Sequence, residues 1–274
     1  MTCRVATIIL NRNLPEAADK LVEHLQKYDS SETDVFVLDA GSDESNLSKY
    51  VTWHANTPEQ KKNGLRYSRG MNYALNQLVL EGKFDKYDAF FLLTNDTELP
   101  NSKTVNPLIN VLSAHKEVGI LSPCSRKWGE ASLLKQQKTK YFWFIHNNAF
   151  LVRRSLIEDL CDVDTPSGIN LFDGSNFRGY LSEMELIAKT YANDWAAAIT
   201  SEVFAEENES YLMEKSDLIK TDAFDKNREL YISEGMQWLK QKYGFNSRWS
   251  MQMYAKNFYE HFFVYHPDLI QYKI

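Results

Sequence analysis

Oxygen-bearing side chains follow three apolar runs of the sequence, and their types are those that bind cations and phosphates. Asn11 follows the first run, Asp39 follows the second, and Asp96 and Glu98 follow the third. Carboxylate oxygens are the ligands that Mg²⁺ and similar hard cations prefer, and such a cation in turn binds phosphate oxygens. A site built from these residues would hold a divalent cation together with a phosphorylated ligand.

The segments that precede these residues predict an α/β fold. Residues 15–28 separate the first two runs and place their apolar side chains at helical spacing, so the expected order is strand, helix, strand. This order favours a parallel sheet with crossover helices. Ligands of such sheets bind beyond the carboxyl ends of the strands, where we expect Asn11, Asp39 and Asp96 to meet. The expected strands are residues 5–10, 35–38 and 87–93.

Four stretches of the first half contain motifs that occur in a defined order, namely VATIILNRN, DVFVLDAGSDES, NGLRYSRGMNYAL and AFFLLTNDTEL. Together they resemble the nucleotide-sugar-binding half of a family 2 glycosyltransferase. The resemblance implies the GT-A fold, a Rossmann-like and mostly parallel central sheet flanked by helices. It also implies an enzyme that transfers a hexosyl group from a nucleoside-diphosphate sugar to a hydroxyl group, with inversion at the sugar carbon.

The same resemblance implies donor-binding roles for several polar residues. In that family an acid after the second strand contacts the nucleotide base or ribose, and this acid maps onto Asp39. An arginine and an asparagine that approach the nucleotide and its diphosphate map onto Arg69 and Asn72, with Arg66 as a further candidate. Asn11, at the end of the first strand, is expected to line the same site.

The motif Thr94-Asn95-Asp96 corresponds to the metal motif of the family, which is of DxD type. We expect Asp96 to bind Mn²⁺ or Mg²⁺, because a hard cation neutralises the charge that develops on a diphosphate leaving group. Asn95 replaces the first acid of a strict DxD, and it is expected to contact the nucleotide sugar. Glu98 lies two residues after Asp96 and so restores the spacing of an acid pair. It is a candidate second ligand of the cation, but the sequence leaves the identity of that ligand open.

An acidic pair that opens a helix contains the catalytic base in this family, and it maps onto the segment LSEMEL. The alignment places Glu183 at the base position and Ser182 at the preceding acid, while Glu185 remains an alternative base. A carboxylate at this point would take the proton of an acceptor hydroxyl. Acids also favour the first turn of any helix because of its dipole, so a purely structural role stays open for both glutamates.

Residues 141–154 resemble the strand that crosses under the active site in the family. His146 and Asn148 occupy the part of this segment that would face the site, and we expect them to contact the acceptor. A histidine among aromatic residues is more often a packed core residue, which is the alternative for His146.

The composition is typical of a soluble cytoplasmic enzyme. The chain has 274 residues, of which 43% are hydrophobic and 25% charged, enough for a full α/β core. Its net charge of −6 argues against nucleic acid as a partner. Three cysteines, without a close pair or an even count, favour a reducing compartment. The sequence has neither a signal-like N-terminus nor a run of about 20 apolar residues, so we expect no transmembrane segment.

The expected organisation is a GT-A catalytic domain over residues 1–212 followed by a helical extension over residues 213–274. Within the catalytic domain, residues 1–100 would bind the nucleotide sugar and residues 101–212 the acceptor. The extension mixes charges with many aromatic residues, which predicts two or three amphipathic helices with a break at Gly244. Its aromatic stripe would pack on the catalytic domain, form a homodimer or make a peripheral membrane contact.

Two other function classes remain open. A sugar-nucleotide pyrophosphorylase would need a glycine-rich loop with Arg and Lys after the first strand to hold a triphosphate, and here that loop reads NRNLP. A non-catalytic nucleotide- or glycan-binding protein would keep the binding strands and lose the base. The sequence therefore predicts a metal-dependent glycosyltransferase with a UDP, dTDP or GDP sugar as donor and a glycan or another hydroxyl compound as acceptor.

Overall fold

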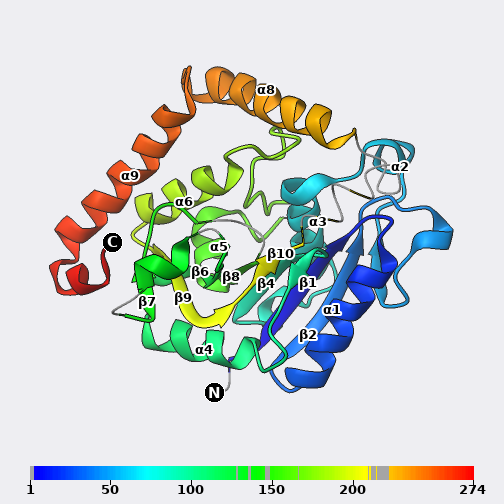
Figure 1. Cartoon of the computed structure of the whole chain (residues 1–274), viewed down its shortest axis with the longest axis horizontal. Helices are drawn as coiled ribbons and strands as arrows, with labels where there is room; N and C mark the ends of the chain where they lie inside the picture. Colours follow the sequence, from blue (N-terminus) through cyan, green and yellow to red (C-terminus); the bar gives the residue numbers. More distant parts are fainter. Residues whose placement is uncertain are drawn as a thin grey trace.

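The central sheet of the protein has eight strands in the part of the chain that the structure describes, in the order β3-β2-β1-β4-β8-β6-β9-β7 (Figure 1). The structure is a computed structural model that describes residues 3–127, 129–134, 137–145, 149–165, 167–208, 210, 214 and 222–274. The strands are β1 (Val5–Asn11), β2 (Thr33–Asp39), β3 (Val51–His54), β4 (Ala89–Thr94), β5 (Thr97–Glu98), β6 (Val118–Cys124), β7 (Thr139–Tyr141), β8 (Ala149–Arg153), β9 (Ala196–Phe204) and β10 (Glu206–Glu207). The helices are α1 (Pro15–Tyr28), α2 (Pro58–Asn63), α3 (Arg66–Leu80), α4 (Val105–Ala114), α5 (Arg154–Leu160), α6 (Ser182–Ala192), α8 (Phe224–Tyr243) and α9 (Arg248–Tyr265).

The first half of the sheet is parallel, as the sequence predicts. β1 pairs with β2 and with β4 in parallel, and the register places Asn11 beside Asp39. These strands are continuous apolar runs because helices cover both faces of the sheet, which leaves no face for polar side chains. Helix α1 begins at Pro15, whose fixed φ and missing N–H suit the first helical position. The α/β architecture is therefore confirmed, and the strand ends of this half lie at one edge.

The second half of the sheet is mixed. β8 runs antiparallel to both β4 and β6, whereas β6 and β9 are parallel. The strand expected over residues 141–154 is shorter in the structure, since β8 covers only Ala149–Arg153 and α5 begins at Arg154. Trp143 and Phe144 leave the sheet and pack against an apolar cluster under the C-terminal helices, which explains the break.

The C-terminal helices α8 and α9 form the outer rim of the molecule, with α6 between α9 and the sheet (Figure 1). Gly244 adopts a left-handed φ of 72° where α8 ends, and the Ser247 side chain caps α9, so the predicted break is confirmed. Tyr259, Phe262 and Phe263 of α9 are buried in the main core. The extension thus packs on the sheet domain, and no helix among the described residues is long and apolar enough to cross a bilayer.

Candidate active site

A chain of buried polar contacts joins the carboxyl ends of β1, β2 and β4. The Asn95 side chain donates from Nδ2 to Oδ1 of Asn11 at 2.8 Å, and Asn11 Nδ2 donates to Oδ2 of Asp39 at 3.1 Å. Asn11 and Asp39 have no exposed surface. The three expected donor-site residues therefore meet at one edge of the sheet, although they lie far apart in the sequence.

The turn after β2 holds Asp39 in place. Ser42 donates from its backbone N–H to Oδ1 at 2.8 Å and from its hydroxyl to Oδ2 at 2.6 Å, while Nε2 of His54 lies 3.6 Å from Oδ1. Gly41 has a φ of +90°, and a Cβ there would lie 2.1 Å from the Gln60 carbonyl oxygen. Only glycine fits this turn, so the local sequence DAGS fixes the orientation of the carboxylate.

Asp96 lies just beyond β4 with one carboxylate oxygen unused. Its Oδ1 is buried and accepts no hydrogen bond from the described residues. Burial raises the pKa of Asp96, and a hydrogen bond from Thr94 only partly offsets this effect. A buried acceptor without a donor is costly, so it indicates a ligand. The donor set fits Mg²⁺ or Mn²⁺, which need one or two carboxylates and keep other positions for water and phosphate.

Glu98 lies in strand β5, whereas Asp96 lies in the turn between β4 and β5. In that strand, which pairs antiparallel with β10, Glu98 lies beside Glu206. Its exposed carboxylate accepts a hydrogen bond from Asn208 Nδ2 at 2.9 Å. No group of three or more metal-binding side chains occurs within the described ranges. The second ligand of a cation at Asp96 therefore stays open.

Arginines from three separate segments gather beside this edge. Arg66 opens α3 with a φ of +55°, and burial, together with the nearby charges of Arg178 and Arg12, lowers its pKa to about 10. The Arg66 and Arg69 guanidinium groups lie over the Phe177 ring at 5.6 and 4.8 Å from its centre. The charges of Asp222 and Glu234 offset only part of the repulsion between these arginines, so an anion such as a diphosphate would stabilise the cluster further.

Asn72 faces a loop backbone. Its Nδ2 donates to the Phe172 carbonyl at 2.7 Å, and its Oδ1 accepts from the Phe172 N–H at 3.1 Å. Asn76, one turn later on α3, binds both backbone groups of Ile169 in the same way. Arg69 adds a hydrogen bond from Nε to the Gly174 carbonyl at 2.7 Å. This side of α3 therefore positions the loop that leads into α6.

Glu183 is the acid whose properties fit proton transfer. It lies in the first turn of α6, and burial raises its pKa to about 7. Its Oε2 is buried and accepts no hydrogen bond from the described residues. Burial raises the pKa of Tyr67 and of Tyr231, and the negative charge of Glu183 adds to this effect at both phenols.

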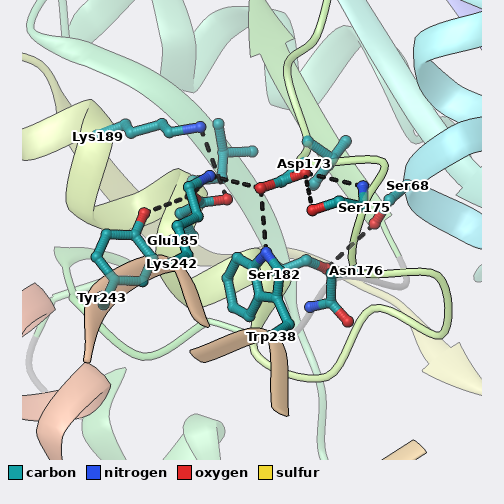
Figure 2. A network of polar contacts seen from close by, with 12 residues as sticks. Ser68, Asp173, Ser175, Asn176, Ser182, Glu185, Lys189, Trp238, Lys242 and Tyr243 are labelled. Atoms are coloured by element: carbon teal, nitrogen blue, oxygen red, sulfur yellow. Dashed lines mark hydrogen bonds and ion pairs between the residues drawn. The ribbon is translucent and has the colours of Figure 1, made fainter. Parts of the chain in front are cut away.

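Glu185 has a different environment from Glu183, two residues away on the same helix. Its side chain is buried, with Lys242 Nζ at 2.5 Å from Oε1 and Lys189 Nζ at 3.6 Å from Oε2. The Tyr243 hydroxyl also donates to Oε1. Figure 2 shows these partners around the carboxylate. Protein groups therefore satisfy Glu185, whereas they leave Glu183 available.

Contacts between neighbouring segments connect the carboxyl ends of β1, β2 and β4 to helix α6, which contains Glu183. The backbone at Gly64 approaches the Arg12 side chain so closely that a Cβ at Gly64 would lie 2.4 Å from Nη1 of Arg12. Ser68 of α3 donates to the Ser182 hydroxyl at 3.3 Å, and Ser182 in turn donates to the Gly179 carbonyl at 2.8 Å. The N-termini of α3 and α6 thus lie together beside the residues that follow β1.

Comparison with known proteins gives a match at the level of the fold. No protein family model and no curated protein sequence matches the chain. The structure of S. aureus TarS residues 1–349 in complex with UDP matches with a TM-score of 0.53 and 13% identity, over 87% of this chain and 73% of that chain. The structure of GalNAc-T7 with UDP, GalNAc and Mn²⁺ matches with a TM-score of 0.55 and 9% identity, over 98% of this chain and 58% of that chain.

The chain has the GT-A fold. This confirms the fold class expected from the sequence, because the parallel first half of the sheet and the antiparallel β8 both belong to that architecture. Among the site residues expected from the sequence, the GT-A sheet brings Asn11, Asp39 and Asn95 into direct contact. His146 and Asn148 lie outside the described residues.

Several residues of this GT-A site were not found from the sequence. Arg12 follows directly after the first strand, so its position at the strand edge was a usable signal. Tyr67 sits between the two expected arginines of α3, but an aromatic residue on a helix usually indicates core packing. Arg178 and Tyr231 had no local signal, because only the tertiary fold brings α8 to the loop before α6.

Proposed function

We propose that the protein is an inverting, metal-dependent glycosyltransferase of family 2 that transfers a hexosyl group to a hydroxyl of a glycan or other acceptor. The observation that carries the proposal is Glu183, whose Oε2 is buried without a hydrogen-bond partner among the described residues and whose pKa burial raises to about 7, at the start of a helix that contacts α3 of a GT-A fold. Solved structures with this fold contain UDP, UDP-GlcNAc, or UDP with GalNAc and Mn²⁺. A UDP, dTDP or GDP sugar is the proposed donor.

The sugar donor would bind along the carboxyl ends of β1, β2 and β4, which we call the donor edge. Asp39 and Asn11 are held rigidly by their mutual hydrogen bond, which suits recognition of the base or ribose. Arg66 and Arg69 would face the diphosphate, whose negative charge relieves the repulsion within the arginine cluster. In this proposal Asn72 acts through the loop that it orders, by holding Phe172 in place.

Asp96 would hold Mn²⁺ or Mg²⁺ through its buried, unpartnered Oδ1, with Glu98 as a candidate second ligand. When bound, the cation would supply charge neutralisation for the diphosphate leaving group. Asn95 lies between Asp96 and the donor edge and donates to Asn11, so it would orient the nucleotide sugar without adding negative charge.

Glu183 would accept the proton of the acceptor hydroxyl. As this O–H bond breaks, the acceptor oxygen forms a bond to the anomeric carbon, and the bond from that carbon to the diphosphate oxygen breaks with its electron pair. The nucleoside diphosphate leaves from the opposite face, which inverts the configuration. A base with a pKa near the working pH is efficient, because it is ionised before the reaction and still basic enough to take the proton.

The acceptor would lie on the side of Glu183 where Tyr67 and Tyr231 present their phenols. His146 and Asn148 remain predicted acceptor contacts. The division into a catalytic domain of residues 1–212 and an extension of residues 213–274 is likewise a proposal, as are a cytoplasmic location and a homodimer or membrane contact through α8 and α9.

Two measurements test this function. Melting temperatures with UDP, dTDP and GDP, each with and without Mn²⁺, identify the nucleotide, because a ligand bound only by the folded state raises the melting temperature. Donor hydrolysis or sugar transfer is then measured for the wild type and for Glu183→Gln. We expect the variant to bind the nucleotide and lose at least about 100-fold in rate. Binding without transfer or hydrolysis in the wild type would indicate a binding protein instead, and diphosphate release from a nucleoside triphosphate and a sugar phosphate would indicate a pyrophosphorylase.

A further inference from the structure

A lysine of the C-terminal helix α8 lies between two carboxylates of the sheet domain. Lys242 Nζ is 2.5 Å from Oδ2 of Asp173 and 2.5 Å from Oε1 of Glu185. Trp238 of the same helix donates from its indole N–H to Asp173 at 3.0 Å, and the Tyr243 hydroxyl donates to Glu185. Figure 2 shows these three α8 side chains converging on the two acids. The contacts fix α8 to two separate points of the domain.

The charges of this network depend on one another. Burial opposes the ionisation of Asp173, but hydrogen bonds from Lys242, Ser175 and Trp238 outweigh it and lower its pKa. Burial also disfavours the charged form of Lys242, and the two carboxylates reverse this effect and raise its pKa. Glu185 is 1% exposed. Removal of the lysine charge would leave the two carboxylates without the cation that they share, and Lys189, 3.6 Å from Oε2 of Glu185, would offset only part of that loss.

The two acids lie at either end of the segment that presents Glu183. Asp173 begins the loop that contains Phe177 and Arg178, and this loop runs directly into α6. Glu185 is in the first turn of α6, two residues after Glu183. The residue before the helix, Leu181, has a left-handed φ of 63° and makes no side-chain cap. Because Leu181 provides no cap, the contacts of Asp173 and Glu185 with α8 contribute to fixing the start of α6.

The opposite end of α8 attaches to the same loop. Arg178 donates from Nη2 to Asp222 at 3.0 Å, from Nε to Glu234 at 3.1 Å and from Nη1 to Asn227 at 2.8 Å. Gly235 lies against the Tyr180 ring so closely that a Cβ would be 2.3 Å from its Cβ atom. Helix α8 therefore contacts the loop at the beginning, at the middle and at the junction with α6.

We propose that Lys242 is a positioning residue for catalysis, because it joins Asp173 to Glu185 and so fixes where the first turn of α6 presents Glu183. This inference rests on the proposed function. In this inference helix α8 supports catalysis by positioning the first turn of α6, although it lies outside the central sheet. A displacement of about 1 Å at a reacting group can slow a reaction about 100-fold, so a contact of this kind has a measurable kinetic effect.

The test compares Lys242→Met with Lys240→Met in the full chain, with each assay run well below the melting temperature of the variant. Lys240 is an exposed lysine on the same helix and is the matched control. We expect Lys242→Met to lower kcat about 10- to 100-fold, with the KM for the donor within about twofold of the wild type because the donor edge is unchanged. Lys242→Arg keeps the positive charge and should recover much of the rate. If Lys242→Met does not fold, Tyr243→Phe replaces it in the same assays, because this change removes only the hydrogen bond from the Tyr243 hydroxyl to Glu185.

Hydrogen exchange gives a second readout that does not require activity. The amides of residues 173–186 should exchange faster in Lys242→Met than in Lys240→Met, while those of β1 and β4 keep their rates. A lower melting temperature with an unchanged kcat would overturn the inference, since the contact would then be merely structural. A wild-type protein that neither transfers nor hydrolyses a sugar would overturn the proposed function, whatever the exchange rates show.

Discussion

Replacement of Glu183 by glutamine should stabilise the protein at alkaline pH while it removes activity. The carboxylate is buried, and its Oε2 has no hydrogen-bond partner among the described residues. Ionisation at that position is therefore unfavourable in the folded state. Glutamine has nearly the same shape and stays neutral, so Glu183→Gln removes the cost of the charge without leaving a cavity.

The size of this effect follows from the pKa of the carboxyl group. Burial raises that pKa from 4.5 to about 7, and each pKa unit corresponds to about 1.4 kcal/mol. Ionisation of Glu183 thus destabilises the folded state by about 3 kcal/mol. Because the folded-state pKa of Glu183 is above the unfolded value, this group does not destabilise the wild type below pH 4.5. The wild type loses about 3 kcal/mol as the pH rises through 7, since the unfolded state releases its proton first.

Urea denaturation at several pH values measures the prediction. Glu183→Gln and the wild type should have similar free energies of unfolding near pH 4, and the variant should be more stable by about 3 kcal/mol near pH 9. The rate of sugar transfer by the wild type should rise with pH through about 7, since only the ionised base accepts a proton. The variant should show no such rise.

Glu185→Gln is the matched control, because the same change is made two residues away in the same helix turn. Its carboxylate binds Lys242, Lys189 and Tyr243, so loss of the charge should destabilise the protein by about 2 kcal/mol at neutral pH. If Glu183→Gln destabilised the protein at pH 9, or if its effect were equal at pH 4 and pH 9, the assignment of Glu183 as a buried, unpaired acid would be refuted.

Three further predictions follow from single contacts. Asp96→Asn should abolish the extra thermal stabilisation that Mn²⁺ gives to the nucleotide complex, and an unchanged effect of Mn²⁺ would remove Asp96 as its ligand. Asn76→Ala leaves both backbone groups of Ile169 without the partners that Asn76 provides, and it should lower the free energy of unfolding, measured with urea, by about 2 to 4 kcal/mol. A loss below about 0.5 kcal/mol would contradict a stabilising role for these two hydrogen bonds. Gly179→Ala forces a side chain into a φ of +83° and should lower stability by about 1 to 2 kcal/mol; an unchanged melting curve would show that the loop adapts.

The parallel half of the fold could be predicted from the sequence because its signals are local. β1, β2 and β4 are apolar runs, and α1 has a proline at its first position, so strand and helix ends were found within a few residues. Asn11 and Asp39 are the last residues of β1 and β2, and Asn95 follows β4 directly. Parallel pairing then brings them together without further information, since all carboxyl ends of such strands lie at one edge.

Asn72 shows the limit of a motif. The sequence indicates that it lies near the start of α3, and the structure places it there, buried at 7% exposure. Which group its amide binds depends on the loop at Phe172, one hundred residues later, and that loop has no regular pattern. The backbone of an irregular loop must still satisfy its hydrogen bonds, and polar side chains of a neighbouring helix are the groups available to do so.

The different environments of Glu183 and Glu185 depend on helix geometry together with a distant partner. Successive residues of an α-helix are rotated by about 100°, so two positions apart point to nearly opposite sides. An alternating acid pattern at the start of α6 therefore guarantees that one carboxylate faces away from the other, but it does not say which one faces the substrate. The structure distinguishes the two acids through α8, which brings Lys242 and Tyr243 to Glu185 and makes no such contact with Oε2 of Glu183 among the described residues. The extension thus gives two similar acids different surroundings, since Lys242 and Tyr243 bind Glu185 while burial raises the pKa of Glu183.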